Sequence, residues 1–242
     1  TPTVVRVESL EAAELVKLFN NTYRDIQFSI GNLFNEIAQS FGIDGIQAIR
    51  NANFGYPRSK IASPGFVGGP CLEKDSYILT HNLSSASGKE FVLNARSYNE
   101  SLHGRASDWV REQAKATNGR ALLMGMAFKG EPPTGDLRGS SSVAIARELS
   151  AKGIEVVMHD FHAEKEELEA LGVGSVLERL DSAEGRFGVI AILTNTRKYR
   201  ELSNAQIDRL LLPEGRLLDV WGVLRDRYGL FGSEQVYRHI GN

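Results

Sequence analysis

Only one cysteine, Cys71, occurs in the 242 residues, so an internal disulfide is excluded. No group of cysteines and histidines has the spacing of a zinc site. The longest apolar run is far shorter than the roughly 20 residues that cross a bilayer, and the first residues lack the organisation of a signal peptide. These absences predict a protein without a metal site or a membrane segment, in a reducing, cytoplasmic location.

A large excess of charge of one sign is also missing. The formal net charge is -2 at pH 7, which argues against a general nucleic-acid binder but allows a local basic pocket for a phosphorylated small molecule. Internal repeats and low-complexity tracts are absent as well. The remaining composition, 42% hydrophobic and 24% charged, is that of a globular protein long enough for two modest cores.

Helical periodicity dominates the first half of the chain. From Ser9 to about Phe41, apolar residues recur at helical spacing without a proline, which predicts one long helix. About 33 residues would span about 50 Å. A small domain does not need a helix of such length. The length therefore favours a helix that also packs against a partner subunit. Shorter helices are expected over residues 44–52, 75–83 and 89–116.

After residue 118 the pattern changes to strands that alternate with helices. The expected strands cover residues 121–127, 154–160, 188–193 and 216–221, and the expected helices cover 141–152, 163–171 and 204–211. Such a pattern predicts a parallel sheet covered on both faces, with ligands beyond the carboxyl ends of the strands. The predicted fold class is therefore α/β, with a helical dimerisation domain over residues 1–117 and a Rossmann-like domain over 118–242.

Cys71 stands near the end of a glycine-rich loop that starts at Pro64. Glycines let the backbone approach a ligand closely, and Lys74 would favour the thiolate, which is the form that attacks carbon. Asp75 could act as a base or order a water molecule. Since free cysteine is also a common buried apolar residue, the loop alone leaves a structural role open.

The loop after the first expected strand, residues 128–138, carries two cations. Lys129 and Arg138 could hold phosphates through charge-assisted hydrogen bonds. Ser140, Ser141 and Ser142 begin the next helix, where backbone amides attract anions, although serine is equally a common helix cap.

Four segments in fixed order resemble the UDP-glucose/GDP-mannose 6-dehydrogenase family. They are Glu14–Thr22 with Asn35-Glu36, the cysteine loop, Met124–Lys129 with Thr134–Arg138 and Ser140–Ser142, and Leu218–Gly222. In the family the cysteine loop typically ends Cys-x-Pro-Lys-Asp. The match covers nearly the whole chain.

The resemblance implies NAD-dependent oxidation of the carbon 6 alcohol of a nucleotide sugar to a carboxylate, as in polysaccharide biosynthesis. Cys71 would form a thiohemiacetal and then a thioester, which water hydrolyses. Lys17 and Asn21 lie one helical turn apart and would stabilise an oxyanion. Asp75 would order or deprotonate the hydrolytic water.

The same resemblance assigns the binding residues. Lys129 would hold the sugar nucleotide, and the backbone of Gly68 would approach the sugar ring. Arg58 would reach the substrate site of the neighbouring subunit in a homodimer formed through the long helix. Lys74 and Arg138 resemble residues that contact the pyrophosphate of NAD.

The chain departs from the family in several places. The Gly-x-Gly-x-x-Gly domain that binds NAD is not among these residues, so we expect the carboxyl-terminal part of a longer enzyme, without turnover on its own. Phe66, Pro70 and Glu73 differ from the common loop residues, and the loop with Arg58 is shorter than in UDP-glucose enzymes. Trp221 stands near the position where UDP-glucose enzymes have a sugar-binding arginine. These differences argue against glucose as the sugar, but they do not identify another sugar or the base.

Two other functions are compatible with the residues. The chain could be a non-catalytic module that binds a nucleotide sugar or mediates dimerisation. It could also be a cysteine hydrolase that uses Cys71 with His81 or His103, although nothing in the spacing places either histidine beside the thiol.

Overall fold

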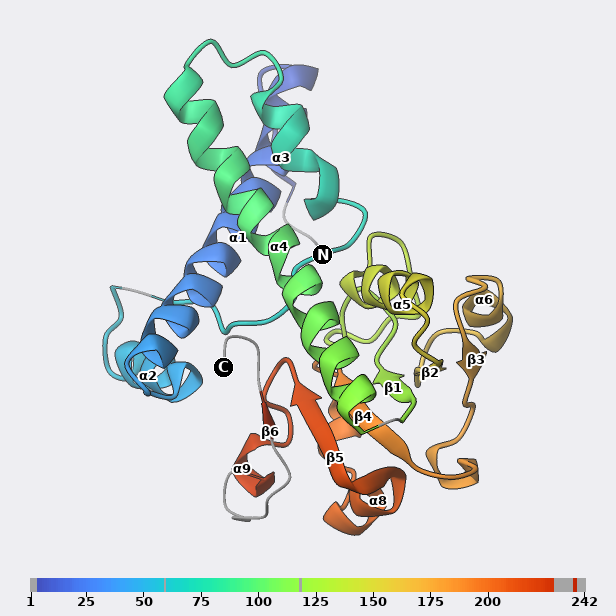
Figure 1. Ribbon diagram of the computed structural model, residues 1–242. Coiled ribbons are helices and arrows are strands. Elements are labelled where there is room, and N and C mark those ends of the chain that lie inside the picture. Colours follow the sequence, from blue (N-terminus) through green and yellow to red (C-terminus); the bar gives the residue numbers. More distant parts are fainter. Residues whose placement is uncertain (1–3, 59, 118, 229–236, 239–242) are drawn as a thin grey trace.

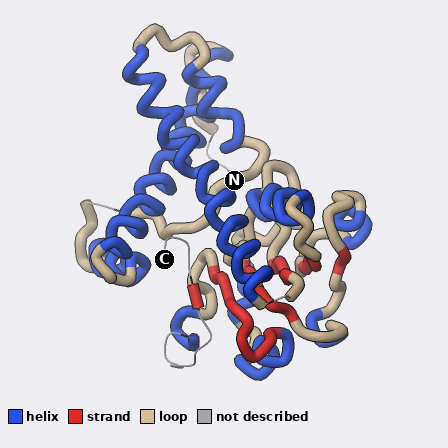
Figure 2. Tube along the Cα trace, in the orientation of Figure 1, coloured by secondary structure: helices blue, strands red, loops and turns tan. Residues whose placement is uncertain are grey.

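The computed structural model describes residues 4–58, 60–117, 119–228 and 237–238. Figures 1 and 2 show that the first part of the chain is helical and that the strands lie together in the second part. The predicted α/β class, with a very long helix followed by a Rossmann-like parallel sheet, is confirmed.

Four helices form the first part. They are α1 (Leu10–Ser40), α2 (Gly45–Asn53), α3 (Leu72–Thr80) and α4 (Ala86–Ala116). The hydroxyl of Ser9 accepts a hydrogen bond from the amide of Ala12 and so begins α1. Ser85 begins α4 in the same way, three residues before the predicted start, so α4 has the same 31-residue length as α1. Helix α3 also begins three residues early, which moves Cys71 to its amino end.

The face of α1 that packs inside the chain is polar. Its buried residues are Thr22, Asp25, Ser29, Gly31, Asn32 and Asn35. The apolar residues that predicted the helix lie mostly on the exposed face, among them Tyr23 at 63% exposure, Leu33 at 43% and Ile37 at 45%. The apolar face of α1 therefore finds no partner within the described part of the chain.

The second part is a six-stranded sheet in which every described pairing is parallel. The strands are β1 (Ala121–Met124), β2 (Val156–His159), β3 (Ser175–Val176), β4 (Phe187–Ile192), β5 (Leu211–Asp219) and β6 (Tyr237–Arg238). Their order is β3-β2-β1-β4-β5-β6, so the direction of the connections reverses between β1 and β4, where such sheets bind ligands.

Short helices connect the strands. They are α5 (Ser141–Ala151), α6 (Lys165–Glu169), a 3₁₀ helix (Leu180–Ser182), α7 (Arg197–Arg200), α8 (Asn204–Leu210) and α9 (Arg225–Tyr228). The sequence did not predict the two-residue strands β3 and β6, which are too short to show a pattern. Strand β5 begins at Leu211 instead of residue 216, directly after α8, which ends one residue earlier than expected.

Helix α4 joins the helical part to the sheet (Figure 1). Its carboxyl-terminal half contributes Leu102, Ala106, Val110 and Ala114 to a core that also contains residues of β1, β4 and α5. The division into two domains at residue 117 stays a prediction. In the part of the chain that the structure describes, no helix has both the length and the apolar character to cross a membrane.

Candidate active site

Cys71 precedes the first turn of α3 and is partly buried. Its backbone carbonyl accepts hydrogen bonds from the amides of Lys74 and Asp75, at 3.2 and 2.9 Å. The first amides of a helix have no partners within the helix and carry partial positive charge. The thiol is therefore held where proteins commonly stabilise an anion.

Asp75 lies one turn further along α3 and is buried. The Asn21 Nδ2 atom donates to its Oδ2 at 2.6 Å, and the Lys74 Nζ atom donates to its Oδ1 at 3.0 Å. Burial alone would raise the pKa of Asp75, but these two hydrogen bonds and the nearby charge of Lys17 outweigh it, so the pKa is lowered from 3.8. The structure thus brings Lys17, Asn21, Lys74 and Asp75 together.

Lys74 and Arg138 come from different parts of the chain but both lie near Cys71. The pKa of Lys74 is raised chiefly by its hydrogen bond to Asp75, and that of Arg138 by its hydrogen bonds to Asp136. A weak electrostatic interaction with Cys71 is the last of the causes in both shifts. The sheet part therefore supplies a cation to the end of α3.

Arg138 is anchored by its bidentate contact with Asp136. Its Nε and Nη2 atoms donate to the two carboxylate oxygens at 3.0 and 2.7 Å, and this contact lowers the pKa of Asp136 to about 2. This contact fixes the orientation of the Arg138 side chain. Because the side chain is 77% exposed, solvent still reaches it.

The glycines of the cysteine loop permit contact with the sheet part. A Cβ atom on Gly68 would lie 2.3 Å from the carbonyl oxygen of Gly139, and the amide of Gly69 donates to that same oxygen at 2.8 Å. Gly69 has φ of +100° and lies against the ring of Phe128, over which the Lys129 Nζ atom sits 5.3 Å from the centroid. Lys129 is thus placed near the cysteine loop, to which Gly68 belongs.

Arg58 is the predicted site residue that the structure does not bring to the others. It lies exposed on a loop that Asn53 closes through hydrogen bonds to the amide and carbonyl of Ile61, at 2.8 and 2.9 Å. This loop follows α2, at the end of α1 opposite to α3 (Figure 1). Within the described residues, no contact joins Arg58 to Cys71.

Trp221 is fixed by packing contacts. Its Nε1 atom donates to the carbonyl of Leu193 at 3.1 Å, and a Cβ atom on Gly65 would lie 2.6 Å from its ring. The residue near the expected position of a sugar-binding arginine therefore supports the cysteine loop from the sheet side.

Among the described residues, no hydrogen bond joins Cys71 to either histidine of the hydrolase hypothesis. His81 ends α3 while Cys71 begins it, and a helix of that length separates the two by roughly 14 Å. His103 lies on α4. Burial is the main cause that lowers its pKa, and the charged groups that act on it are Glu148, Glu100 and Arg96. The cysteine-hydrolase function loses its support.

A cleft of about 600 Å³ opens beside the cysteine loop, between α4 and the amino end of α5. Its lining includes Gly68, Glu73, His103, Arg138, Ser141 and Arg147. The cleft gives a small molecule access to the loop from the side where Arg138 lies. Among the described residues, no group of three or more metal-ligating side chains comes together.

Sequence reasoning missed the buried polar residues that support the loop. Asp25, Asn32 and Arg96 are each at most 2% exposed, and all three contact the loop or one another. A signal was present, because the polar side chains of α1 recur at helical spacing opposite its apolar ones.

Family models match both parts of the chain. The central domain of the UDP-glucose/GDP-mannose dehydrogenase family matches residues 11–101, and the UDP binding domain of the same family matches residues 122–226. The chain belongs to the UDP-glucose/GDP-mannose dehydrogenase family. The resemblance inferred from the motifs is confirmed.

Relatives in this family include UDP-sugar dehydrogenases. UDP-N-acetyl-D-mannosamine dehydrogenase of Methanococcus vannielii is 28% identical over 210 residues, which cover 85% of this chain and 46% of that protein. UDP-N-acetyl-D-glucosamine 6-dehydrogenase of Pseudomonas aeruginosa is 32% identical over 161 residues, or 64% of this chain and 37% of that protein.

The solved structure of UDP-D-ManNAc dehydrogenase from Pyrococcus horikoshii superimposes with a TM-score of 0.77 at 27% identity. The match covers 95% of this chain and 52% of that structure. The chain therefore spans about half the length of the relatives that it matches.

Proposed function

We propose that this chain carries the catalytic cysteine of an NAD-dependent nucleotide-sugar 6-dehydrogenase, which oxidises the carbon 6 alcohol to a carboxylate. The observation that carries the proposal is the hydrogen-bonded group of Asn21, Lys74 and Asp75 one turn beyond Cys71. A cysteine with only a packing role would not need two donors committed to a buried carboxylate one turn away.

Cys71 acts as the nucleophile. After the first oxidation, its Sγ atom adds to the carbonyl carbon of the carbon 6 aldehyde, so that a C–S bond forms and the π electrons move to the oxygen. Lys17 stabilises this oxyanion, and Asn21 supports it from the same helical face. Oxidation of the resulting thiohemiacetal gives a thioester.

Asp75 assists the hydrolysis of the thioester. Water adds to the thioester carbonyl, the C–S bond breaks, and the thiolate leaves as the carboxylate forms. Because the pKa of Asp75 is lowered, its carboxylate is a weak base at neutral pH, and we assign it the role of orienting the water molecule.

The residues present fit the pyrophosphate of NAD. Lys74 and Arg138 both lie near Cys71. Their side chains are 58% and 77% exposed, so both can contact an anion while remaining anchored to Asp75 and Asp136. When bound, NAD would accept the two hydrides that leave carbon 6.

Lys129 and Gly68 are the proposed contacts to the nucleotide sugar, and the names of the relatives direct attention to N-acetylated UDP-sugars. Both residues lie at the junction of the cysteine loop with the loop that follows β1. That junction is near the carboxyl ends of β1 and β4, where doubly wound sheets bind ligands.

The homodimer is proposed to form through α1. Seven of its apolar residues, spaced alternately by three and four positions, form what we call the apolar seam: Val16, Phe19, Tyr23, Ile26, Ile30, Leu33 and Ile37. Such spacing is that of helices that pack against each other along their length. In the dimer, Arg58 would enter the site of the other subunit from its exposed loop.

The test is NADH formation from a panel of UDP-sugars and GDP-mannose, using the protein that carries this sequence at its full natural length. We expect two NADH per sugar and a uronate product with at least one N-acetylated UDP-sugar. The variant Cys71→Ala should release no uronate. Uronate formation by this variant at the wild-type rate would refute the proposed role of Cys71.

A further inference from the structure

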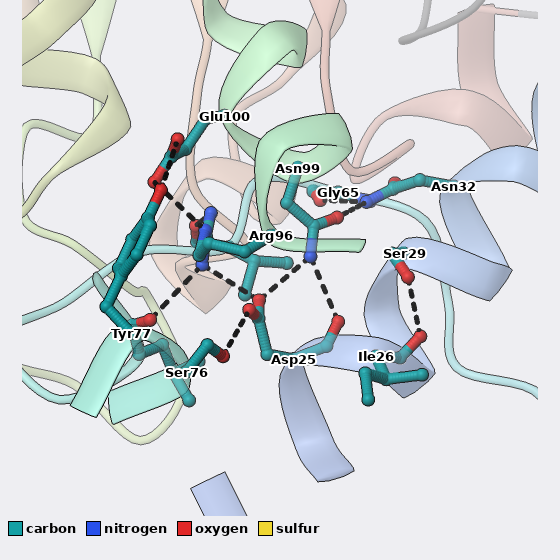
Figure 3. Close-up of polar contacts among 12 residues, drawn as sticks. Asp25, Ile26, Ser29, Asn32, Gly65, Ser76, Tyr77, Arg96, Asn99 and Glu100 are labelled. Carbon is teal, nitrogen blue, oxygen red and sulfur yellow. Dashed lines mark hydrogen bonds and ion pairs between the residues drawn. The ribbon is translucent and has the colours of Figure 1, made fainter. Parts of the chain in front are cut away.

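The centre of the helical part is polar and fully enclosed. Asp25 of α1 contacts the Arg96 Nη1 atom at 2.8 Å and the Asn99 Nδ2 atom at 2.9 Å, both from α4 (Figure 3). Ser76 of α3 donates to the other Asp25 oxygen at 3.3 Å. We call Asp25, Arg96, Asn99 and Asn32 the polar cluster; each of the four is at most 2% exposed.

Stability alone does not explain this cluster. Taking two charges out of water costs several kcal/mol per ion, and replacing a buried ion pair by apolar residues is often neutral or stabilising. A cluster that joins three helices through charged and amide groups instead fixes directions, because hydrogen bonds constrain geometry more than apolar contacts do.

The directions that the cluster fixes are those of the cysteine loop. The Asn32 side chain is bound to both backbone groups of Gly65, accepting from the amide at 2.7 Å and donating to the carbonyl at 3.0 Å. The Arg96 Nη2 atom donates to the carbonyl of Val67 at 3.1 Å, and its Nη1 atom lies 3.5 Å from the carbonyl of Leu72. The loop is thus held on both sides of Cys71.

Other elements hold the same loop from its opposite side. The amide of Gly69 bonds to the carbonyl of Gly139, and Gly65 packs on Trp221. Arg96 also contacts Glu100 of α4 through its Nε atom at 3.2 Å. The cluster therefore reaches the loop from the helical part, while the sheet part covers it.

We propose that Arg96 and Asn32, oriented by Asp25 and Asn99, are positioning residues that fix the cysteine loop in the conformation that presents Cys71 to the substrate. This inference deepens the proposed function and depends on it. None of the four residues contacts the thiol itself, so their effect on chemistry passes through the backbone of residues 65–72.

The first measurement uses the fact that Cys71 is the only cysteine. Alkylation by iodoacetamide therefore reports on this thiol alone, and it requires neither nucleotide sugar nor NAD. In Arg96→Met and in Asn32→Asp, which loses the donor to Gly65, we expect the alkylation rate to change by about tenfold and its pH midpoint to shift. Arg96→Lys keeps the positive charge but loses the planar guanidinium group with its several donors. Its change in alkylation rate should lie between those of the wild type and Arg96→Met.

The matched control is Tyr199→Phe, which removes a fully buried hydroxyl that donates a hydrogen bond to the backbone carbonyl of His159 and makes no hydrogen bond to the described residues of the cysteine loop. All proteins are compared at the same interval below their melting temperatures. The control should lose stability and keep the wild-type pH profile of alkylation. An unchanged profile in Asn32→Asp and Arg96→Lys, or an equal change in the control, would overturn the positioning role.

A second measurement separates this inference from the proposed function. In the full-length protein, the positioning variants should lose kcat by about tenfold or more with a smaller change in KM. If the wild type oxidises no nucleotide sugar but the alkylation profiles still respond, the proposed function fails and the positioning of the thiol stands. If the wild type is active and the variants retain kcat, the positioning role fails.

Discussion

At the scale of single residues, Asp75 shows how neighbours override burial. Its carboxylate is enclosed, yet the hydrogen bonds from Asn21 and Lys74 keep its pKa below 3.8. We therefore predict no loss of activity from protonation of Asp75 between pH 5 and 8. The variant Asp75→Asn should lower kcat by about 10²-fold or more at every pH in this range.

The control for Asp75 is Asp108→Asn, which removes an exposed carboxylate of α4 that pairs with Lys152. This variant should keep the wild-type kcat. A kcat of Asp75→Asn that equals that of Asp108→Asn would contradict the role given to Asp75.

His159 is a second buried titratable residue, in β2. Burial, the largest cause, lowers its pKa to about 4. The charge of Asp160 opposes this shift, and the smaller effect of Lys198 adds to it. Its Nδ1 atom lies 2.9 Å from the hydroxyl of Tyr199. The neutral imidazole therefore contributes stability that is complete above about pH 6.5 and is lost as the pH falls toward 4.

We predict that His159→Gln, which cannot be protonated, removes this dependence. Between pH 7.5 and 4.5, the wild type should lose up to about 3 kcal/mol more unfolding free energy than the variant. Urea denaturation at both pH values measures the difference. Parallel losses in the two proteins would show that His159 is not responsible.

Sequence reasoning grouped the candidate residues correctly in space where the motifs were local. The residues form two groups, each local in sequence: Lys17 with Asn21, and the run from Cys71 to Asp75. The structure places these two groups together. Asp25 and Arg96 are 71 positions apart, so only the packing of α1 on α4 reveals that they form a pair. Arg58 cannot be placed from one chain, because its proposed target belongs to another copy.

At the scale of elements, α1 reverses the usual relation between polarity and burial. The apolar residues correctly predicted the helix. They did not predict that the apolar face would point away from the rest of the chain, because periodicity does not tell which partner a helix face will meet. Polar residues of α1 pack on α3 and α4, and the apolar seam stays exposed, where we propose that a second copy binds. The start of α3 was predicted too late, because the residue before its first turn, Cys71, makes no capping hydrogen bond through its side chain.

The apolar seam gives a prediction about assembly. Ile30→Glu places a carboxylate in the middle of the seam, where it would be buried between two subunits without a partner, so the dimer should dissociate. The control Arg24→Glu introduces the same group on the exposed flank of α1 and should stay dimeric. Sedimentation equilibrium measures both, and a dimeric Ile30→Glu variant of wild-type affinity would rule out this interface.

At the scale of the whole molecule, the cysteine loop lies between the helical part and the sheet part. The fold of each part followed from its own periodicity. The contact of the cysteine loop with the sheet part could not be predicted, because it rests on the close approach of Gly68 to Gly139. No side-chain pattern in the sequence marks such a backbone contact.

This junction predicts opposite effects for two glycines. Gly68→Ala would bring a Cβ atom to 2.3 Å from the Gly139 oxygen, so the loop must shift, at a cost of about 1–3 kcal/mol. Gly104→Ala lies within α4 with no atom nearby and should stabilise by about 0.5–1 kcal/mol. Thermal unfolding compares the two, and equal shifts of melting temperature would contradict the described junction.

The most direct test of the central claim is to trap the acyl group on Cys71. The full-length Asp75→Asn protein is mixed with its nucleotide sugar and NAD, quenched with acid within the first turnovers, and digested for mass spectrometry. We predict a peptide in which Cys71 carries a nucleotide-uronyl thioester that hydroxylamine removes. Uronate formation in the same sample, with the Cys71 peptide unmodified at every time point, would contradict it.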